Sequence, residues 1–286
     1  MVNRKITVKH YLNKRANAKL LVKEKYFPLY IQIIVNGKKA QIKSKINEHL
    51  KIYRSDIERI TKNNQEMNSL LMQGYVSERF FEEIEKLKLF PLHQLLLDEV
   101  VVITKIISLQ QPFTNKEFTL NNFSDDYSKY TEEITQKLDT KIKELYLNEL
   151  KGMFLKSINQ DENKELFKIT NYLIHFINWQ NSFSNFYDTS FEILPDQMVA
   201  IENLLSNELI TQIKAFMAFH SKVNVLKRFF EKRELGKIST LSYLDWQTDI
   251  REYVYKEFER LFGEQKTLQY IVSIEALLTQ DLKMAI

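Results

Sequence analysis

Glutamine and lysine side chains alternate with apolar ones in two short stretches that flank Asn36-Gly37. Lysine ammonium groups bind guanine and phosphate oxygens, and a glutamine amide can pair with adenine. The residue types therefore suit contact with a nucleic acid, provided that they share one surface. The polar set consists of Tyr30, Gln32, Ile34, Lys39, Gln41 and Lys43, with Lys45 beyond it.

A β-hairpin would place these side chains on one face. Asn36-Gly37 between alternating stretches is the strongest short hairpin pattern, because both central residues of a type I′ turn need positive φ. The turn fixes the register, and a slip of one residue would exchange the two faces. The predicted pairs are Val35 with Lys38, Ile34 with Lys39, Ile33 with Ala40, Gln32 with Gln41, Ile31 with Ile42 and Tyr30 with Lys43.

The segment "ITVKHYL", residues 6–12, predicts a further strand of the same sheet. Its alternation assigns Ile6, Val8 and Leu12 to the apolar face and Thr7, Lys9 and Tyr11 to the polar face. A two-stranded hairpin alone is only marginally stable, so we expect a three-stranded antiparallel sheet. The connection to the hairpin is basic and contains Lys14, Arg15, Lys19, Lys23 and Lys25.

Two helices are expected to cover the apolar face of this sheet. The segment 55–74 has a Ser55/Asp56 cap, apolar residues at helical spacing and a stop at Gly74. The segment 76–91 predicts a second helix, ended by Pro91. Residues 1–90 are therefore predicted to form a small α+β domain.

The remaining chain is expected to be helical, because five glycines and four prolines in 286 residues are few for a sheet-rich protein. Helices are predicted within 92–109, 131–158 and 163–183, in a middle region (91–212) of unknown role. Three more, the first ending near Gly236 and the second near Gly263, form a predicted helical domain at 213–286. The predicted fold is mainly α, with a three-stranded sheet packed on helices at the N-terminus.

Charge is divided unevenly along the chain. Residues 1–54 contain fourteen Lys or Arg and two acids, Glu24 and Glu48, whereas the remainder contains 27 basic and 35 acidic residues. Such a split is typical of a domain that meets a polyanion. A well-solvated surface is the plainer interpretation, but such surfaces mix acids with bases and the predicted polar face has no acid.

Several classes of function are excluded or disfavoured. The chain has no cysteine, which excludes disulfides, thiolate metal sites and cysteine nucleophiles. No phosphate-binding glycine motif, HExxH motif or calcium-loop spacing occurs, and the five histidines are scattered. We therefore expect no catalytic residues, no metal and no cofactor. No signal peptide or membrane span is evident, so a soluble cytoplasmic protein without membrane contact is expected.

The N-terminal stretch "ITVKHYLNKR…FPLYIQIIVNGKKAQIKSKI" resembles the arm-type DNA-binding domain of tyrosine recombinases (phage-type integrases), particularly those of Bacteroidetes mobile elements. That family has a first strand, a variable basic loop, "P-[IL]-Y-[ILV]-x-[IV]…N-G-[KR]-[KRA]" and a polar third strand. The similarity covers residues 3–46 well and 47–90 loosely. One departure is that the family commonly has a tryptophan after the third strand, where this chain has Tyr53.

The C-terminal helices resemble the core-binding, SAM-like domain of the same recombinases, whose last helix carries "[KS]-T-[ILV]-x-x-[YH]-[IVL]…L…A". Lys266, Thr267, Tyr270 and Ala285 occupy matching places. The resemblance implies double-stranded DNA as the partner, with other recombinase subunits or accessory DNA-bending proteins. Expected DNA-contacting residues are Lys9, Tyr11, Lys14, Arg15, Tyr30, Gln32, Lys39, Gln41, Lys43, Lys45, Lys222, Lys227, Arg228, Lys266 and Thr267.

The family's catalytic domain uses arginines, a lysine, histidines and a nucleophilic tyrosine, and no R…H-x-x-R…Y arrangement occurs here. The sequence thus predicts a non-catalytic DNA-binding chain, either a fragment of a recombinase or a natural chain without the catalytic part. The alternative is a helical interaction protein of a phage, mobile element or defence system, whose basic N-terminal domain binds RNA or an acidic protein. A stand-alone enzyme of unrecognised type is a third possibility, which no cluster of residues supports.

Overall fold

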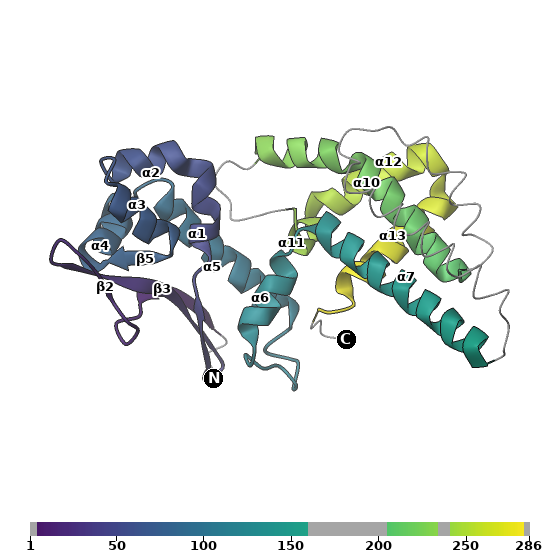
Figure 1. Cartoon of the computed structure of the whole chain (residues 1–286), viewed down its shortest axis with the longest axis horizontal. Coiled ribbons are helices and arrows are strands. Elements are labelled where there is room, and N and C mark those ends of the chain that lie inside the picture. The colour runs from purple at the N-terminus through teal and green to yellow at the C-terminus, as the bar shows by residue number, and fades with distance from the viewer. Residues whose placement is uncertain (1–4, 160–204, 234–240, 283–286) are drawn as a thin grey trace. The chain divides into compact units, whose positions relative to one another are not determined.

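The computed structural model describes residues 5–159, 205–233 and 241–282 (Figure 1). The chain is mainly helical, with an antiparallel sheet near its N-terminus. It divides into two compact units. The first comprises Met1–Glu132, Phe229–Gln247 and Asp281–Ile286, and the second comprises Glu133–Arg228 and Thr248–Gln280.

The three predicted strands are present, and the two strands of the hairpin have the predicted register. Strand β3 (Glu24–Val35) lies between β1 (Ile6–Leu12) and β4 (Lys38–Lys43). All six predicted β3–β4 pairs are present, including Gln32 with Gln41. Asn36 and Gly37 have φ of 49° and 78°, so both adopt the left-handed conformation that a type I′ turn requires. The hairpin prediction is confirmed.

The sheet has two more strands than predicted. Strands β2 (Lys19–Leu21) and β5 (Tyr75–Ser77) pair with the N-terminal half of β3. The turn between β2 and β3 has positive φ at Val22 and Lys23, of 52° and 85°. Because neither residue is a usual turn former, the sequence pattern indicated only a basic connection at this place.

One face of the sheet forms the main core of the first unit. Its helices are α1 (Ile46–His49), α2 (Arg54–Ile60), α3 (Gln65–Met72), α4 (Glu78–Leu87) and α5 (Leu92–Leu109), with a 3-10 turn at Leu50–Tyr53. Figure 1 shows α2, α3 and α4 on one side of β2 and β3. Leu29, Ile31, Ile33 and Val35 point inward and are buried.

The helix predicted over 55–74 is instead two helices. Lys62 and Asn63 adopt left-handed φ of 54° and 60°, which separates α2 from α3. The side chain of Asn64 accepts a hydrogen bond from the backbone N–H of Met67 at 3.0 Å and caps α3. Asparagine favours left-handed and capping positions, which explains the break. Ser55 lies within α2 and caps nothing, so the Ser55/Asp56 cap was wrong.

The next helices agree more closely with the sequence. Helix α4 begins after Ser77, which caps it through the N–H of Phe80. It ends at Leu87, where Lys88 follows in a left-handed conformation, before the predicted stop at Pro91. Helix α5 matches its predicted bounds. A further helix, α6 (Phe123–Thr131), lies in a segment for which no helix was predicted. It packs through buried aromatic residues such as Tyr127.

The second unit contains α7 (Ile134–Asn159), most of α10 (Asn207–Arg233), α12 (Arg251–Phe262) and α13 (Glu264–Thr279). The helix predicted to end at Gly263 is interrupted, because Thr248 has non-helical φ and ψ of −96° and −131°. Before the break, Asp245 of the short α11 (Tyr243–Asp245) forms a capping box with Ser242. The helix predicted within 163–183 lies outside the described residues.

The two compact units differ from the three predicted domains. Helix α5 contacts β1 and α6 contacts β4, so residues 91–132 belong with the sheet. The predicted domain at 213–286 is divided between the units. In the ranges that the structure describes, no helix combines the length and the apolar character needed to cross a membrane.

Candidate nucleic-acid interface

The outer face of β1, β3 and β4 presents three rows of side chains that run across the strands. Directly opposite residues on one face of a sheet have Cβ atoms about 4.5–5.5 Å apart, so each row is continuous. We call this surface the outer sheet face. Its rows are Thr7–Ile34–Lys39, Lys9–Gln32–Gln41 and Tyr11–Tyr30–Lys43.

The polar groups of the outer sheet face are accessible to solvent. Lys9, Lys39, Gln41 and Lys43 are exposed, and Gln32 is half-buried between its neighbours. Within the described part of the chain, the three lysines make no ion pair, and the rows contain no acidic residue. Gln32, Gln41 and Lys43 therefore point away from the core, and the cationic groups can meet an anionic partner.

Two tyrosines give one end of the face its shape. The rings of Tyr11 and Tyr30 lie opposite each other, with centroids 6.2 Å apart and planes inclined by 52°. Burial raises the pKa of Tyr11, Tyr30 raises it further, and the Arg15 guanidinium opposes the shift. The phenol of Tyr11 consequently stays protonated near neutral pH and can donate a hydrogen bond to a phosphate oxygen.

Lys45 does not belong to this face, contrary to the prediction. Its Nζ donates to Ser128 Oγ at 2.7 Å and lies 5.0 Å from the centre of the Tyr127 ring. Strand β4 ends at Lys43, and the buried Ser44 leads the chain into α1, so the strand alternation stops before Lys45. The side chain consequently turns toward α6.

The basic connection after β1 supplies charge beside the strands. Lys14 and Arg15 are both exposed, as expected for residues that could contact DNA. Lys14 forms an ion pair with Glu78, at the start of α4. Exposed ion pairs contribute little to stability, so Lys14 could exchange Glu78 for a phosphate at small cost.

The predicted contacts in the C-terminal helices do not form a comparable surface. Thr267 is fully buried (0 % exposed) on the inward side of α13, so its assignment to DNA contact was wrong. Lys222 is half-buried, with Nζ 3.4 Å from Glu257 Oε2. Lys266 is exposed and lies 5.6 Å from the ring centre of Tyr270. The side chains of Lys227 and Arg228 lie outside the described residues.

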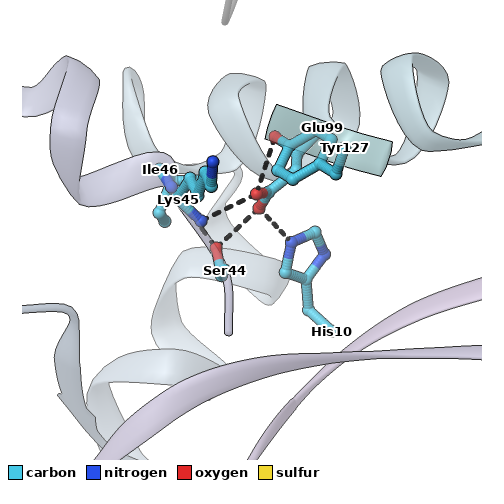
Figure 2. Close-up of polar contacts among 6 residues, drawn as sticks. All are labelled: His10, Ser44, Lys45, Ile46, Glu99 and Tyr127. Atoms are coloured by element: carbon cyan, nitrogen blue, oxygen red, sulfur yellow. Dashed lines mark hydrogen bonds and ion pairs between the residues drawn. The ribbon is translucent and has the colours of Figure 1, made fainter. Parts of the chain in front are cut away.

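A buried carboxylate beneath the sheet was not predicted (Figure 2). Oε2 of Glu99 lies 2.9 Å from His10 Nε2 and accepts from Ser44 Oγ at 2.6 Å. Oε1 accepts from the Lys45 backbone N–H at 2.8 Å and from the Tyr127 hydroxyl at 3.1 Å. The side chain of Glu99 is 0 % exposed. We call these residues the Glu99 cluster.

The geometry of the Glu99 cluster indicates a structural role, in which one buried carboxylate links several elements of the fold. His10 and Ser44 both contact the same carboxylate, which differs from the serine–histidine–acid order of a catalytic triad. Burial and the neighbouring Glu99 charge raise the pKa of Tyr127, so its hydroxyl remains a donor. The cluster joins β1 and the end of β4 to α5 and α6, and thereby fixes the strands that carry the outer sheet face.

One feature of the sequence could have indicated the Glu99 cluster. His10 occupies an inward position in the alternation of β1, between Val8 and Leu12, and Glu99 lies in a largely apolar helix. Buried polar groups need partners. Two polar residues at core positions therefore indicate a pair, although the sequence does not say which residues meet.

Within the described ranges, no group of three or more histidine, aspartate or glutamate side chains is placed to hold a metal ion. Comparison with protein-family models, with curated proteins and with solved structures gives no match.

Proposed function

We propose that this protein binds double-stranded DNA, with the outer sheet face placed in the major groove. The observation that carries the proposal is the composition of the three rows, which combine exposed lysines with the exposed Gln41 and the half-buried Gln32, without any acidic residue. Lysine can contact guanine or phosphate, and glutamine can contact adenine in that groove. The uneven charge along the chain supports the same partner, because a cationic domain attracts a polyanion.

The dimensions of the sheet agree with this mode of binding. Neighbouring strands lie about 4.8 Å apart, so three strands span about 10 Å, whereas the major groove of B-form DNA is about 12 Å wide. The corresponding groove of double-stranded RNA is deep and narrow, and side chains cannot read it. Shape therefore favours DNA over the alternative RNA partner.

We further propose that the chain corresponds to the non-catalytic, DNA-binding part of a tyrosine recombinase. The order of an arm-like sheet followed by core-like helices supports this proposal, as does the "N-G-K-K" hairpin pattern. Helices α10 and α13 would then contact a second DNA segment, through Lys222, Lys266 and the neighbouring Lys227 and Arg228. Thr267 is not included, because it is buried.

Salt dependence tests the DNA-binding proposal. Neutralising about five phosphates predicts that the logarithm of the association constant falls with the logarithm of salt concentration, with a slope of about −4.5. The measurement is a mobility-shift series with the full chain, a mixed-sequence DNA duplex and a matched RNA duplex. A flat salt response, or tighter binding to the RNA duplex, would contradict the proposal.

A further inference from the structure

The hairpin formed by β2 and the start of β3 exposes apolar side chains at its tip. Leu20 is 72 % exposed and Val22 is 84 % exposed, although neither belongs to the outer sheet face as defined above. Figure 1 shows this hairpin at the end of the sheet. Single exposed apolar residues are common on protein surfaces, but here two lie within three positions of one turn.

The turn itself is conformationally strained. Val22 is a β-branched residue with φ of 52°, a conformation that such residues rarely adopt. Lys23 follows with φ of 85°. Backbone strain of this kind persists where the surroundings enforce it, and it often occurs where a protein contacts a ligand. Val22 lies in the two-residue loop between the paired residues Leu21 and Glu24.

Charge around the tip indicates the kind of partner. Residues 13–25 contain five basic residues and one acid, Glu24. Lys23 and Lys25 are exposed and form no ion pair within the described part of the chain. Lys19, by contrast, is held at the base of the hairpin, where it contacts Gln73 and lies 4.4 Å from the centre of the Tyr75 ring. The tip thus combines an apolar apex with free cationic flanks on an anchored base.

We propose that this tip enters the minor groove of the duplex whose major groove holds the outer sheet face. Leu20 and Val22 would wedge against a base step, and Lys23 and Lys25 would contact the flanking phosphates. Apolar wedges of this kind partly unstack the bases and bend DNA toward the major groove. The inference rests on the proposed function, and it adds DNA bending to simple binding.

The spacing along β3 permits both contacts on one duplex. β3 is a single strand from Glu24 to Val35, and ten residues separate Val22 from Gln32. At about 3.3 Å per residue this separation is about 33 Å, which is longer than half of a DNA turn of about 34 Å, the spacing along the axis between a major groove and the next minor groove. The tip can therefore reach a minor groove within one turn of the bases that face Gln32.

Bending of a doubly labelled duplex tests the inference. The probe is a mixed-sequence duplex of about 30 base pairs with a fluorescent donor and acceptor at its ends, a length at which bending is measurable. The test variant combines Leu20→Ala with Val22→Gly, because glycine accepts positive φ and preserves the turn. The matched control is Leu87→Ala, which removes another exposed leucine (66 % exposed) from the same unit.

The full wild-type chain is expected to raise energy transfer when it binds, as is the Leu87→Ala control. The double variant is expected to bind about tenfold more weakly and to leave the duplex straight, since the apolar contacts in the groove are lost. Bending of the wild-type kind by the double variant would overturn the inference. The inference would also be overturned if the double variant bends DNA normally but no longer self-associates in analytical ultracentrifugation. The tip would then be a contact between protein chains.

The triple substitution Lys39→Ala, Gln41→Ala and Lys43→Ala separates this inference from the proposed function. If the triple variant loses binding while the tip variant bends DNA as the wild type does, only the inference fails. If the triple variant binds as tightly as the wild type, the proposed function itself fails.

Discussion

Nε2 of His10 lies 2.9 Å from Oε2 of Glu99, a carboxylate with no exposed surface. The two residues are 89 positions apart in the chain, and their contact joins β1 to α5. Because a carboxylate only accepts hydrogen bonds, Nε2 must carry the proton in this contact. Glu99, whose two oxygens have four hydrogen-bonding partners, thus anchors the sheet on the side opposite the proposed DNA face.

Replacing Glu99 by glutamine is expected to destabilise the first unit by about 2–4 kcal/mol, because an amide cannot accept from four donors in a buried site. The measurement is urea unfolding followed by circular dichroism. Tyr127→Phe is the graded control, since it removes one donor and is expected to cost about 1–2 kcal/mol. Equal stability of Glu99→Gln and the wild type would show that the cluster does not have this structural role.

Acid is expected to weaken the fold through His49. The pKa of His49 is lowered, mainly because the side chain is buried. The charges of Glu48 and Glu99 raise this pKa, whereas the charge of Lys45 lowers it, and the net shift is downward. The unfolded chain therefore binds more protons below about pH 6.5, and stability falls as the pH drops through that value. Unfolding midpoints between pH 7.5 and 5 check this, and His49→Gln should reduce the slope. His93→Gln is the control and should leave the pH dependence as in the wild type. If His49→Gln also leaves the pH dependence unchanged, His49 is not the residue responsible.

The two glycines Gly37 and Gly152 are expected to respond oppositely to alanine. Gly37 has φ of 78° in the type I′ turn, so Gly37→Ala should destabilise by about 1 kcal/mol, despite the open space around its Cβ position. Gly152 lies within α7, also with open space, so Gly152→Ala should stabilise by about 0.5–1 kcal/mol. The measurement is the thermal unfolding midpoint of each variant. A higher midpoint for Gly37→Ala than for the wild type would show that Gly37 does not have positive φ.

Local patterns in the sequence predicted the hairpin well. Asn36-Gly37 determines the turn, the turn determines the register, and the register assigns Gln32, Gln41 and Lys43 to the outer face. Each step depends on residues close together in the chain, which is why the prediction could be made without a structure. Helix α5 was also predictable, because it is a long, largely apolar segment without glycine or proline.

Features that depend on distant contacts or unusual turns could not be predicted. Val22 and Lys23 form a turn without glycine or asparagine, so β2 was not recognised. Lys45 follows β4 in sequence, but its partners Ser128 and Tyr127 come from α6. Thr267 matched a family motif, whereas its burial follows from the packing of α13. In each case tertiary contacts override the local pattern.

The position of Lys45 leads to a prediction about DNA affinity. Lys43 is exposed on the outer sheet face, whereas the Lys45 ammonium group is occupied by Ser128 and the Tyr127 ring. Lys43→Ala should therefore weaken duplex binding and reduce the salt slope by about 1, while Lys45→Ala should change neither. Fluorescence anisotropy at several salt concentrations measures both effects. A larger loss for Lys45→Ala would place the interface on the α6 side.

Duplex affinity of the triple variant Lys39→Ala, Gln41→Ala and Lys43→Ala tests the central claim most directly. The matched control is Lys51→Ala, Gln65→Ala and Lys86→Ala, which removes the same residue types from exposed positions outside the outer sheet face. We expect the triple variant to bind about a hundredfold more weakly or worse, since each lost base or phosphate contact contributes about 1–3 kcal/mol. The control is expected to bind nearly as the wild type does, and equal affinities of the two variants would contradict the account.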